Sequence, residues 1–403
     1  MSEARRRLPE AKAKTQAPDR PPPRILINFT AYDALASGAR ERAIGLSAAL
    51  LRLGAEVIVA EPRGADLAAL IPLPDPGAPL RSLRTPLDPG RPSERFLRSR
   101  GVFEALLRAE RPDAFLTDFY PAPRIPGTAV AVTVHDLRYL TGVAPGRRLR
   151  RIYFGTAYAR GLRRADRVVT PSAFTREEAV RLLGLDAERV VVVPNAVPES
   201  LRARPEAAAA ALARERLGLP ARPYLLSVGV LERRKNLSRL LEALAILRGE
   251  GPAPPTLVIA GRGGPEEARL RTASGRLPPG AVHWAGYVRP ADLPAVYAGA
   301  RALIHPATYE GFGMPVVEAM ALGVPVACAD AAALPETAGG AALLFDPADP
   351  RAVADAVRRV CSDDTLRASL AARGLARAAS LTYEASARAL LGSLGLSVPV
   401  ASA

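Results

Sequence analysis

The sequence has few cysteines, histidines, lysines and aromatic residues, and each shortage excludes a class of protein. Two cysteines and three histidines in 403 residues exclude a disulfide scaffold, a cysteine zinc site and a histidine-rich metal centre, and they suit a reducing cytoplasm. Only 5% of the residues are aromatic, so a base-stacking surface for nucleic acid is not expected. No apolar run approaches the ~18 residues that a membrane-spanning helix needs.

The shortage of lysine singles out one position. Of 55 basic residues only three are lysines, and two of them, Lys12 and Lys14, lie near the N-terminus. Lys235 is therefore the only lysine in the part of the chain that is expected to fold. Arginine and lysine are not interchangeable where a compact charge must fit a tight pocket, so Lys235 is a candidate site residue, with chance retention as the alternative.

The formal net charge is +15, and the excess lies mainly in the first half. The densest run comprises Arg147, Arg148, Arg150, Arg151, Arg160, Arg163, Arg164 and Arg167. Such a surface favours anionic partners, namely membrane headgroups, phosphorylated substrates or nucleic acid. Because no nucleic-acid-binding motif appears, nucleic acid is not expected as a partner. A solvated arginine-rich face is the alternative.

Apolar strands alternate with amphipathic helices twice along the chain, a pattern that predicts parallel βαβ units. The first set covers residues 24–197 and the second 223–380. Between them, the alanine- and proline-rich residues 198–222 are predicted to be a linker. Residues 1–23 are predicted to be a disordered basic tail, and a last amphipathic helix covers about 382–395. The predicted fold class is α/β, with two doubly wound Rossmann-like domains facing across a cleft that is the default ligand site.

Two stretches of the first domain have weaker patterns. Residues 61–92 are rich in proline and glycine and are predicted to form a long loop. The apolar spacing of residues 147–164 predicts a helix.

The segment HPATYEGFGMPVVEAMALG (residues 305–323) predicts an anion site at a helix start. Its Gly-Phe-Gly turn lets the backbone approach a ligand closely, and Pro315 suits the first helical turn. The amides of Gly313, Met314 and Val316 would then point out of the helix N-terminus, which favours a diphosphate.

Two glutamates flank that turn, Glu310 before it and Glu318 inside the helix. A carboxylate would repel a phosphate and is better suited to accepting hydrogen bonds from sugar hydroxyls. The pair therefore suggests a nucleotide-sugar, with Glu310 directed to the sugar and Glu318 to the ribose. The alternative is a surface glutamate that caps a helix.

Candidate cations and a histidine follow two other strands. In SVGVLERRKN (residues 227–236) a strand ends at Gly229, and the next loop carries Arg233, Arg234 and Lys235, which could offset the charge of a leaving diphosphate. A solvated basic turn is the alternative. His135 directly follows a predicted strand and should face the cleft, unless it is a structural histidine. The sequence has no D-x-D pair, so an acidic clamp for a metal-bound diphosphate is missing.

Together these strings resemble the retaining glycosyltransferase family 4, which has the GT-B fold. The resemblance is carried by SVGVLERRKN, VIAGRGG, HPATYEGFGMPVVEAMALGVPV and LPETAGGAALLFDP, and by the spacing of Glu310 and Glu318. The first half matches more loosely through VTVHDL, VTPSAFTREE and VVVPNAV.

The resemblance implies a role for each candidate residue. Lys235 with Arg234 would bind the diphosphate, Glu310 the transferred sugar and Glu318 the ribose, while His135 would lie near the reacting sugar. The donor would also contact Gly229, Gly311, Phe312, Gly313, Met314, Tyr287 and Val288, the last two near the base. The final helix would cross back to the first domain.

The sequence departs from the family pattern at two places. Val230 stands where many members have arginine, which leaves open whether Arg233 or Arg234 supplies that charge. The acceptor loop is degenerate, Ser37-Gly38-Ala39-Arg40, and the acceptor contacts Gly38 and Arg40 depend on it.

The resemblance implies a retaining glycosyltransferase that needs no metal or other cofactor. The strings most resemble bacterial mannosyltransferases of surface glycan assembly, which favours transfer of mannose from GDP-mannose to a hydroxyl of a glycan or lipid-linked acceptor. A UDP-sugar donor, a GT-B nucleotide-sugar epimerase or hydrolase, and a degenerate binding subunit are the alternatives. The expected location is the cytoplasm, with peripheral attachment to an anionic inner membrane face left open.

Overall fold

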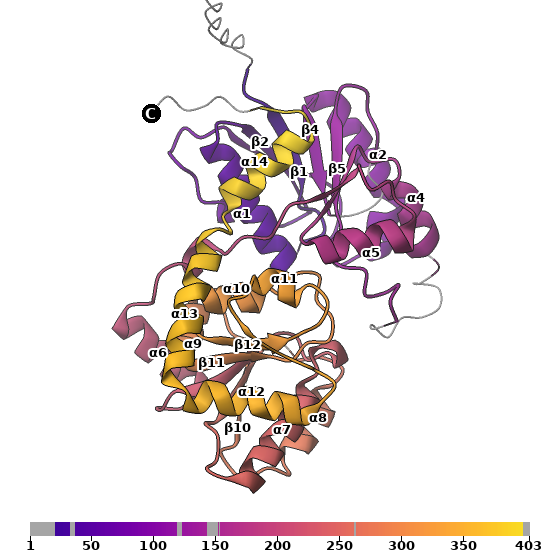
Figure 1. The fold of residues 1–403 in the computed structure, drawn as a ribbon. Coiled ribbons are helices and arrows are strands. Elements are labelled where there is room, and N and C mark those ends of the chain that lie inside the picture. Colours follow the sequence, from indigo (N-terminus) through magenta and orange to yellow (C-terminus); the bar gives the residue numbers. More distant parts are fainter. Residues whose placement is uncertain are drawn as a thin grey trace, which may run out of the picture.

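The computed structural model describes residues 21–32, 37–118, 123–142, 152, 154–261 and 263–397. Almost all of the predicted tail, residues 1–23, lies outside the described residues. The same holds for Arg147, Arg148, Arg150 and Arg151 of the predicted basic run. In the rest of the chain two parallel sheets form two domains (Figure 1).

Seven parallel strands form the N-terminal sheet in the order β3-β2-β1-β4-β5-β6-β7. They are β1 (Arg24–Asn28), β2 (Glu56–Glu61), β3 (Leu80–Arg84), β4 (Ala114–Thr117), β5 (Ala129–Thr133), β6 (Arg167–Thr170) and β7 (Val190–Val192). The helices include α1 (Gly38–Arg52), α2 (Pro92–Glu110), α4 (Ala159–Leu162) and α5 (Ala173–Leu183), with a 3-10 turn η1 (Ala68–Leu70). The inner strands are almost wholly apolar because helices cover both faces of a parallel sheet.

The prediction of a loop over residues 61–92 is wrong at β3, which pairs in parallel with β2 from Val57↔Leu80 to Glu61↔Arg84. This strand, LRSLR, lies at the sheet edge and is mostly exposed, so it lacks the apolar pattern that identifies a buried strand. In the described part of the predicted helix 147–164, a π-helical turn η2 (Phe154–Tyr158) leads into α4.

Six parallel strands form the C-terminal sheet in the order β10-β9-β8-β11-β12-β13. They are β8 (Tyr224–Val228), β9 (Leu257–Ala260), β10 (Val282–Gly286), β11 (Ala300–His305), β12 (Val326–Ala329) and β13 (Leu343–Phe345). The connecting helices are η4 (Arg233–Lys235), α7 (Leu237–Glu250), α8 (Glu267–Ser274), η5 (Pro290–Asp292), α9 (Leu293–Ala298), α10 (Met314–Ala321), α11 (Leu334–Ala338), α12 (Pro350–Ser362) and α13 (Asp364–Ala379). The predicted α/β class with two doubly wound domains is confirmed.

Two helices connect the domains to each other. The predicted linker 198–222 contains η3 (Glu199–Leu201) and α6 (Ala207–Leu217), and α6 packs on α9 of the C-terminal domain. After α13 the chain returns, and α14 (Tyr383–Ser393) packs on α1 of the N-terminal domain (Figure 1). A side chain at Gly45 would overlap the Tyr383 ring, so the two helices cross closely at this glycine.

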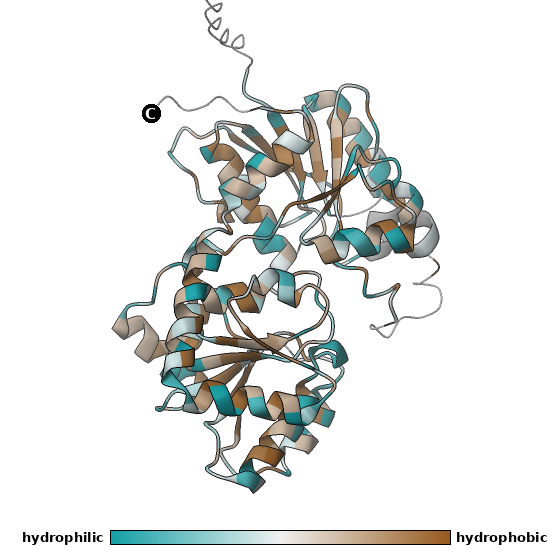
Figure 2. Ribbon diagram, in the orientation of Figure 1, coloured by the Kyte–Doolittle hydropathy of each residue, from teal (hydrophilic) through white to brown (hydrophobic). Residues whose placement is uncertain are grey.

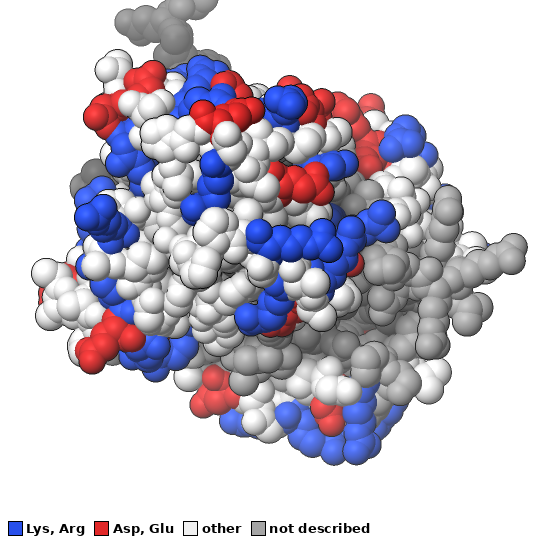
Figure 3. Space-filling view, turned by 90° about the horizontal axis from the view of Figure 1, so that it is seen from below, with Lys and Arg blue, Asp and Glu red and all other residues white. Residues whose placement is uncertain are grey.

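Apolar residues concentrate on the strands and on the inner faces of the helices (Figure 2). On the face drawn in Figure 3, basic and acidic side chains are interspersed. Among the described residues, no helix has both the length and the apolar character needed to cross a bilayer.

Candidate active site

A cleft of about 560 Å³ lies between the two domains, at the carboxyl ends of strands from both sheets. It contains most of the residues that the sequence analysis selected. Those lining it are Gly38, His135, Gly229, Arg234, Lys235, Tyr287, Val288, Glu310, Gly311, Phe312, Gly313 and Met314. Glu318 and Arg40 are not among the residues that line it.

The start of α10 has the predicted glycine and proline, but the prediction is wrong for Val316, whose amide donates to the carbonyl of Gly313 at 3.0 Å and is not free for a ligand. Gly313 occupies the N-cap position with φ of 101°, a left-handed conformation that favours glycine, and Pro315 stands in the first turn. A side chain at Gly313 would also overlap Leu334. The glycine therefore lets the turn form and leaves the first amides of α10 beside the cleft.

Lys235 and Arg234 meet Glu310 at the wall of the cleft. The Lys235 ammonium lies 2.5 Å from Oε1 of Glu310, and Nη1 of Arg234 lies 2.9 Å from Oε2. Nε2 of His305 is 3.3 Å from the same Oε1. Burial alone would raise the pKa of Glu310, but the charge of Lys235, the His305 hydrogen bond and the charge of Arg234 outweigh it and hold that pKa well below its usual value. Glu310 is therefore an anion that binds both cations.

The geometry around Lys235 explains why this position is a lysine. The residue is 9% exposed, and its side chain runs past Gly229, whose φ is 145°. A side chain at Gly229 would stand only 2.9 Å from Cε and Nζ of Lys235. A linear side chain with a compact ammonium fits this passage, whereas a planar guanidinium needs more room.

The two arginines of the same loop differ in their contacts. Arg234 lines the cleft, and its Nε also lies 2.7 Å from the carboxylate of Glu232, which Arg138 approaches at 3.4 Å. Arg233 is exposed and is absent from the cleft lining. Of these two arginines, Arg234 is thus the one that lines the cleft.

Glu318 lies on α10, beside the cleft rather than in its lining. Its carboxylate accepts a hydrogen bond of 2.6 Å from the hydroxyl of Tyr297, which is fully buried. Burial raises the pKa of Glu318, although the Tyr297 hydrogen bond opposes that shift. The two glutamates of the pair are therefore in opposite electrostatic environments.

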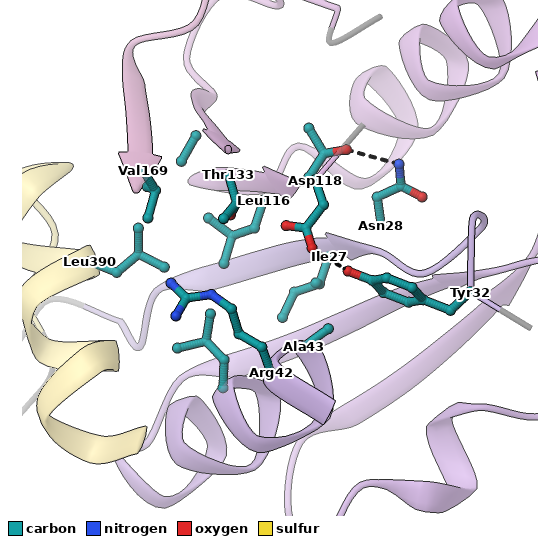
Figure 4. Close-up of a pocket in the computed structure, with 13 residues that line it drawn as sticks. Ile27, Asn28, Tyr32, Arg42, Ala43, Leu116, Asp118, Thr133, Val169 and Leu390 are labelled. Atoms are coloured by element: carbon teal, nitrogen blue, oxygen red, sulfur yellow. Dashed lines mark hydrogen bonds between the residues drawn. The ribbon is translucent and has the colours of Figure 1, made fainter. Parts of the chain in front are cut away.

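On the other side of the cleft, His135 binds an aspartate that the sequence analysis missed. Nε2 of His135 is 2.7 Å from Oδ2 of Asp118, and the Tyr32 hydroxyl donates to the same oxygen at 2.5 Å. Figure 4 shows Asp118, Tyr32 and the buried Arg42 converging on a small pocket from the end of β4, the segment after β1, and α1. Burial opposes ionisation of Asp118, but His135, Tyr32 and Arg42 together lower its pKa.

The sequence did contain a signal for Asp118. It directly follows β4, just as His135 follows β5 closely, and these strands are neighbours in the sheet. Residues at the carboxyl ends of neighbouring parallel strands lie close together. Asp118 was overlooked because no recognisable string surrounds it.

Only one of the two predicted acceptor residues lines the cleft. Gly38 lines the cleft, whereas Arg40 is 6% exposed and pairs with Glu41 at 2.9 Å. Ser37, Asp136, Arg138 and Asn195, which the sequence analysis did not select, also line the cleft from the N-terminal domain.

Direct contacts join the two domains next to Gly311, which lines the cleft. The carbonyl of Gly311 accepts hydrogen bonds from the hydroxyls of Ser172 (2.7 Å) and Thr175 (3.1 Å) at the start of α5. A side chain at Gly311 would overlap the carbonyl of His135. Glu336 of α11 accepts from the amides of Ala173 (2.8 Å) and Phe174 (3.1 Å). The glycine loop is thus held against the other domain.

No group of three or more His, Cys, Asp or Glu side chains within the described ranges could hold a metal ion. The chemistry this cleft offers is that of two cations, a helix start and a buried carboxylate on one side, with an aspartate–histidine pair on the other. These groups suit a ligand that has both anionic and hydroxyl groups.

Known proteins share both halves of this architecture. Residues 36–201 match the family model described as Glycosyltransferase Family 4, and residues 211–377 match the one described as Glycosyl transferases group 1.

Two curated relatives have informative names. The chain is 34% identical to the O-antigen chain mannosyltransferase B of Escherichia coli over 62% of this chain and 66% of that protein. It is 29% identical, over 73% of this chain and 77% of the relative, to a GDP-mannose-dependent alpha-(1-6)-phosphatidylinositol dimannoside mannosyltransferase of Mycobacterium tuberculosis. The chain spans less than two thirds of the length of the first curated relatives that it matches.

Among solved structures, HepE of Anabaena in complex with UDP and glucose superimposes with a TM-score of 0.70 at 17% identity. The superposition covers 93% of this chain and 99% of HepE. At this identity the likeness shows the shared fold.

Proposed function

Since this chain belongs to glycosyltransferase family 4, we propose that it transfers a mannosyl group from GDP-mannose to a hydroxyl of a glycan or lipid-linked acceptor, with retention at the anomeric carbon. One observation carries the proposal: Lys235, Arg234 and Glu310 meet in the same cleft as the glycine-lined start of α10. A donor diphosphate would lie between the cations and the helix start, with the sugar near Glu310.

In this mechanism the bond between the anomeric carbon and the diphosphate oxygen breaks, and a bond from that carbon to the acceptor oxygen forms on the same face. The acceptor proton passes to the departing phosphate oxygen, so no protein nucleophile is needed. Lys235, Arg234 and the amides at the start of α10 stabilise the charge that develops on the leaving group. In this proposal these groups serve the diphosphate without a metal ion.

The N-terminal domain would place the reacting sugar. Since Asp118 is ionised and accepts at Oδ2, Nε2 of His135 carries the proton in that hydrogen bond. Nδ1 is then the atom that can accept from a sugar hydroxyl or, when protonated, donate to one. Asp118 acts through His135 as a positioning residue.

The printed names of the relatives support mannose and GDP. One is called an O-antigen chain mannosyltransferase and another is called GDP-mannose-dependent. The alternative donor is a UDP-sugar, because HepE, which has the same fold, was solved with UDP and glucose. A GT-B epimerase or hydrolase is the other alternative, and it would release its product without an acceptor.

A donor screen by thermal shift tests the proposal. A ligand that binds only the native state raises the melting temperature, by mass action. We expect GDP and GDP-mannose to raise it more than UDP and UDP-glucose. Larger shifts with UDP ligands would reassign the donor, and no shift with any nucleotide would contradict a glycosyltransferase.

The steric course needs its own measurement. An NMR spectrum of the first product should show the anomeric configuration of the donor sugar. The inverted anomer would exclude retention, and free sugar formed equally fast without acceptor would identify a hydrolase.

We also propose a cytoplasmic location on the inner membrane face, where a lipid-linked acceptor would be available. Basic residues attract anionic headgroups. Flotation with anionic liposomes should carry part of the protein upward at low salt. If all of the protein stays in solution, the peripheral location is wrong.

A further inference from the structure

A second cavity, of about 540 Å³, lies behind the loop that carries the catalytic cations. We call it the rear pocket; it is lined by Gly142, Arg233, Arg234, Asn236, Ser238, Arg239, Glu242, Arg269 and Thr308. Its volume is close to that of the cleft between the domains, which we call the main cleft, and Arg234 lines both cavities. None of the roles proposed above uses it.

Among the described residues that line the rear pocket, none has an apolar side chain. The main cleft, in contrast, includes Val228, Leu293, Phe312 and Met314. Polar residues of this kind give no favourable surface for a base, a sugar face or a lipid chain. It suits a small, strongly polar group.

The charge of the rear pocket points to an anion. Four arginines line it against one glutamate. Arg239 is paired with Glu242 at 2.6 Å, and Arg269 contacts Glu266 at 3.2 Å, both in exposed positions where such pairs contribute little. Within the described part of the chain, Arg233 makes no ion pair or side-chain hydrogen bond. Its guanidinium is therefore available to a ligand.

Guanidinium groups match the oxygens of a phosphoryl group with two parallel hydrogen bonds. The hydroxyls of Ser238 and Thr308 and the amide of Asn236 add neutral partners to the lining. We propose that the rear pocket binds a phosphoryl group, carried by a phosphorylated acceptor or present as a free anion.

The position of the pocket connects it with transfer. Three consecutive residues of η4 divide between the cavities: Arg233 faces the rear pocket, Arg234 lines both, and Lys235 lines the main cleft. Gly142 belongs to the N-terminal domain and lines one side of the rear pocket, so an anion bound there would lie at the boundary between the domains. In an acceptor, such an anion would fix the substrate next to the diphosphate of the donor. This connection rests on the proposed function, whereas the phosphoryl site itself does not.

Calorimetric titration with inorganic pyrophosphate tests the site, with saturating GDP present to occupy the main cleft. We expect one pyrophosphate per wild-type chain. The double variant Arg233→Ala/Arg269→Ala should bind it about 100-fold more weakly, roughly tenfold for each lost charge-assisted contact. GDP affinity should be the same in both proteins.

The matched control is Arg222→Ala/Arg276→Ala, which removes the same charge at two exposed positions that line neither cavity. Its pyrophosphate affinity should stay within about twofold of wild type, since diffuse charge is screened by salt. An equal loss in both double variants, or no binding to the GDP-saturated wild type, would overturn the proposal.

Geranyl diphosphate, a short lipid diphosphate, distinguishes the two sources of the phosphoryl group. Affinity equal to that of pyrophosphate, lost in the same double variant, would identify a phosphorylated acceptor. Binding of pyrophosphate alone would identify a free anion. If no nucleotide binds the wild type, the proposed function fails, and the comparison of the two double variants in pyrophosphate alone still decides the rear pocket.

Discussion

The two domains contribute to the cleft in different ways. The C-terminal domain supplies charges from two short strings, the loop with Arg234 and Lys235 and the turn with Glu310, and they neutralise one another within 2.9 Å. The N-terminal domain supplies His135, Asp118 and Tyr32 from three separate segments that the sheet brings together. One side is a compact charge cluster and the other a hydrogen-bonded assembly, which suits a diphosphate on one side and hydroxyls on the other.

Replacing Lys235 should have the largest effect. We expect Lys235→Met to lower transfer at least ~100-fold, because in the proposed mechanism a preorganised charge that stabilises the leaving group is lost. Arg234 and His305 still contact Glu310, so the fold should persist. Steady-state kinetics and circular dichroism measure the two effects.

Lys235→Arg tests whether a positive charge alone is sufficient at this position. It keeps the charge, but the guanidinium lacks room beside Gly229, so it should not restore activity. Turnover close to wild type in either variant would refute the role of Lys235.

Asp118→Asn tests the N-terminal side. A hydrogen bond with a charged partner is worth about 1.5–3 kcal/mol, so we expect transfer to fall by roughly 10- to 100-fold. Because Asp118 acts through His135 in the proposed function, kcat should fall more than affinity for the nucleotide. A variant with unchanged kcat would contradict the positioning role of Asp118.

Gly45→Val should destabilise the N-terminal domain. The valine would overlap Tyr383 of α14, and overpacking typically costs about 1–3 kcal/mol. The free energy of unfolding is measured by urea titration, and calorimetry shows which domain's transition is lowered. Gly249→Val, at an open position on α7 where an added side chain meets no neighbour, is the control for the residue type. Equal losses in both variants would contradict the close crossing of α1 and α14.

The two glutamates should change the pH dependence of stability in opposite directions. The pKa of Glu310 is lowered from 4.5, so its ion pairs stabilise the fold above that pH and this stability is lost as the pH falls. The pKa of Glu318 is raised, so its ionised form opposes folding at neutral pH. Glu310→Gln should flatten the loss of stability in acid, and Glu318→Gln should be neutral or stabilising by under about 1 kcal/mol at pH 7. Urea titrations at several pH values check both, and the same slope in both variants would contradict the opposite environments.

The same contrast between domains explains what the sequence could predict. Short sequence strings contain Lys235, Glu310 and the Gly-Phe-Gly turn, and the residue types in these strings indicate their chemistry. Asp118 becomes a neighbour of His135 only through the pairing of β4 with β5, and Tyr32 only through the path after β1. Contacts between distant segments depend on strand order, which local periodicity does not encode.

The fold shows the same limit. Buried strands such as β1 and β11 were predictable from apolar runs, whereas β3 was missed because an exposed edge strand needs no apolar residues. The helix α6 lies within the predicted linker, and its alanine run has almost no apolar periodicity that would indicate a helix, although α6 packs on α9. The choice between Arg233 and Arg234 required the side-chain positions themselves.

The most direct test is a comparison of GDP with guanosine by calorimetry, in wild type and Lys235→Met. If Lys235 and the start of α10 bind the diphosphate, the variant should lose at least about tenfold in affinity for GDP, roughly 1.4 kcal/mol, and nothing for guanosine. An equal loss for both ligands, or unchanged binding of GDP, would contradict that assignment.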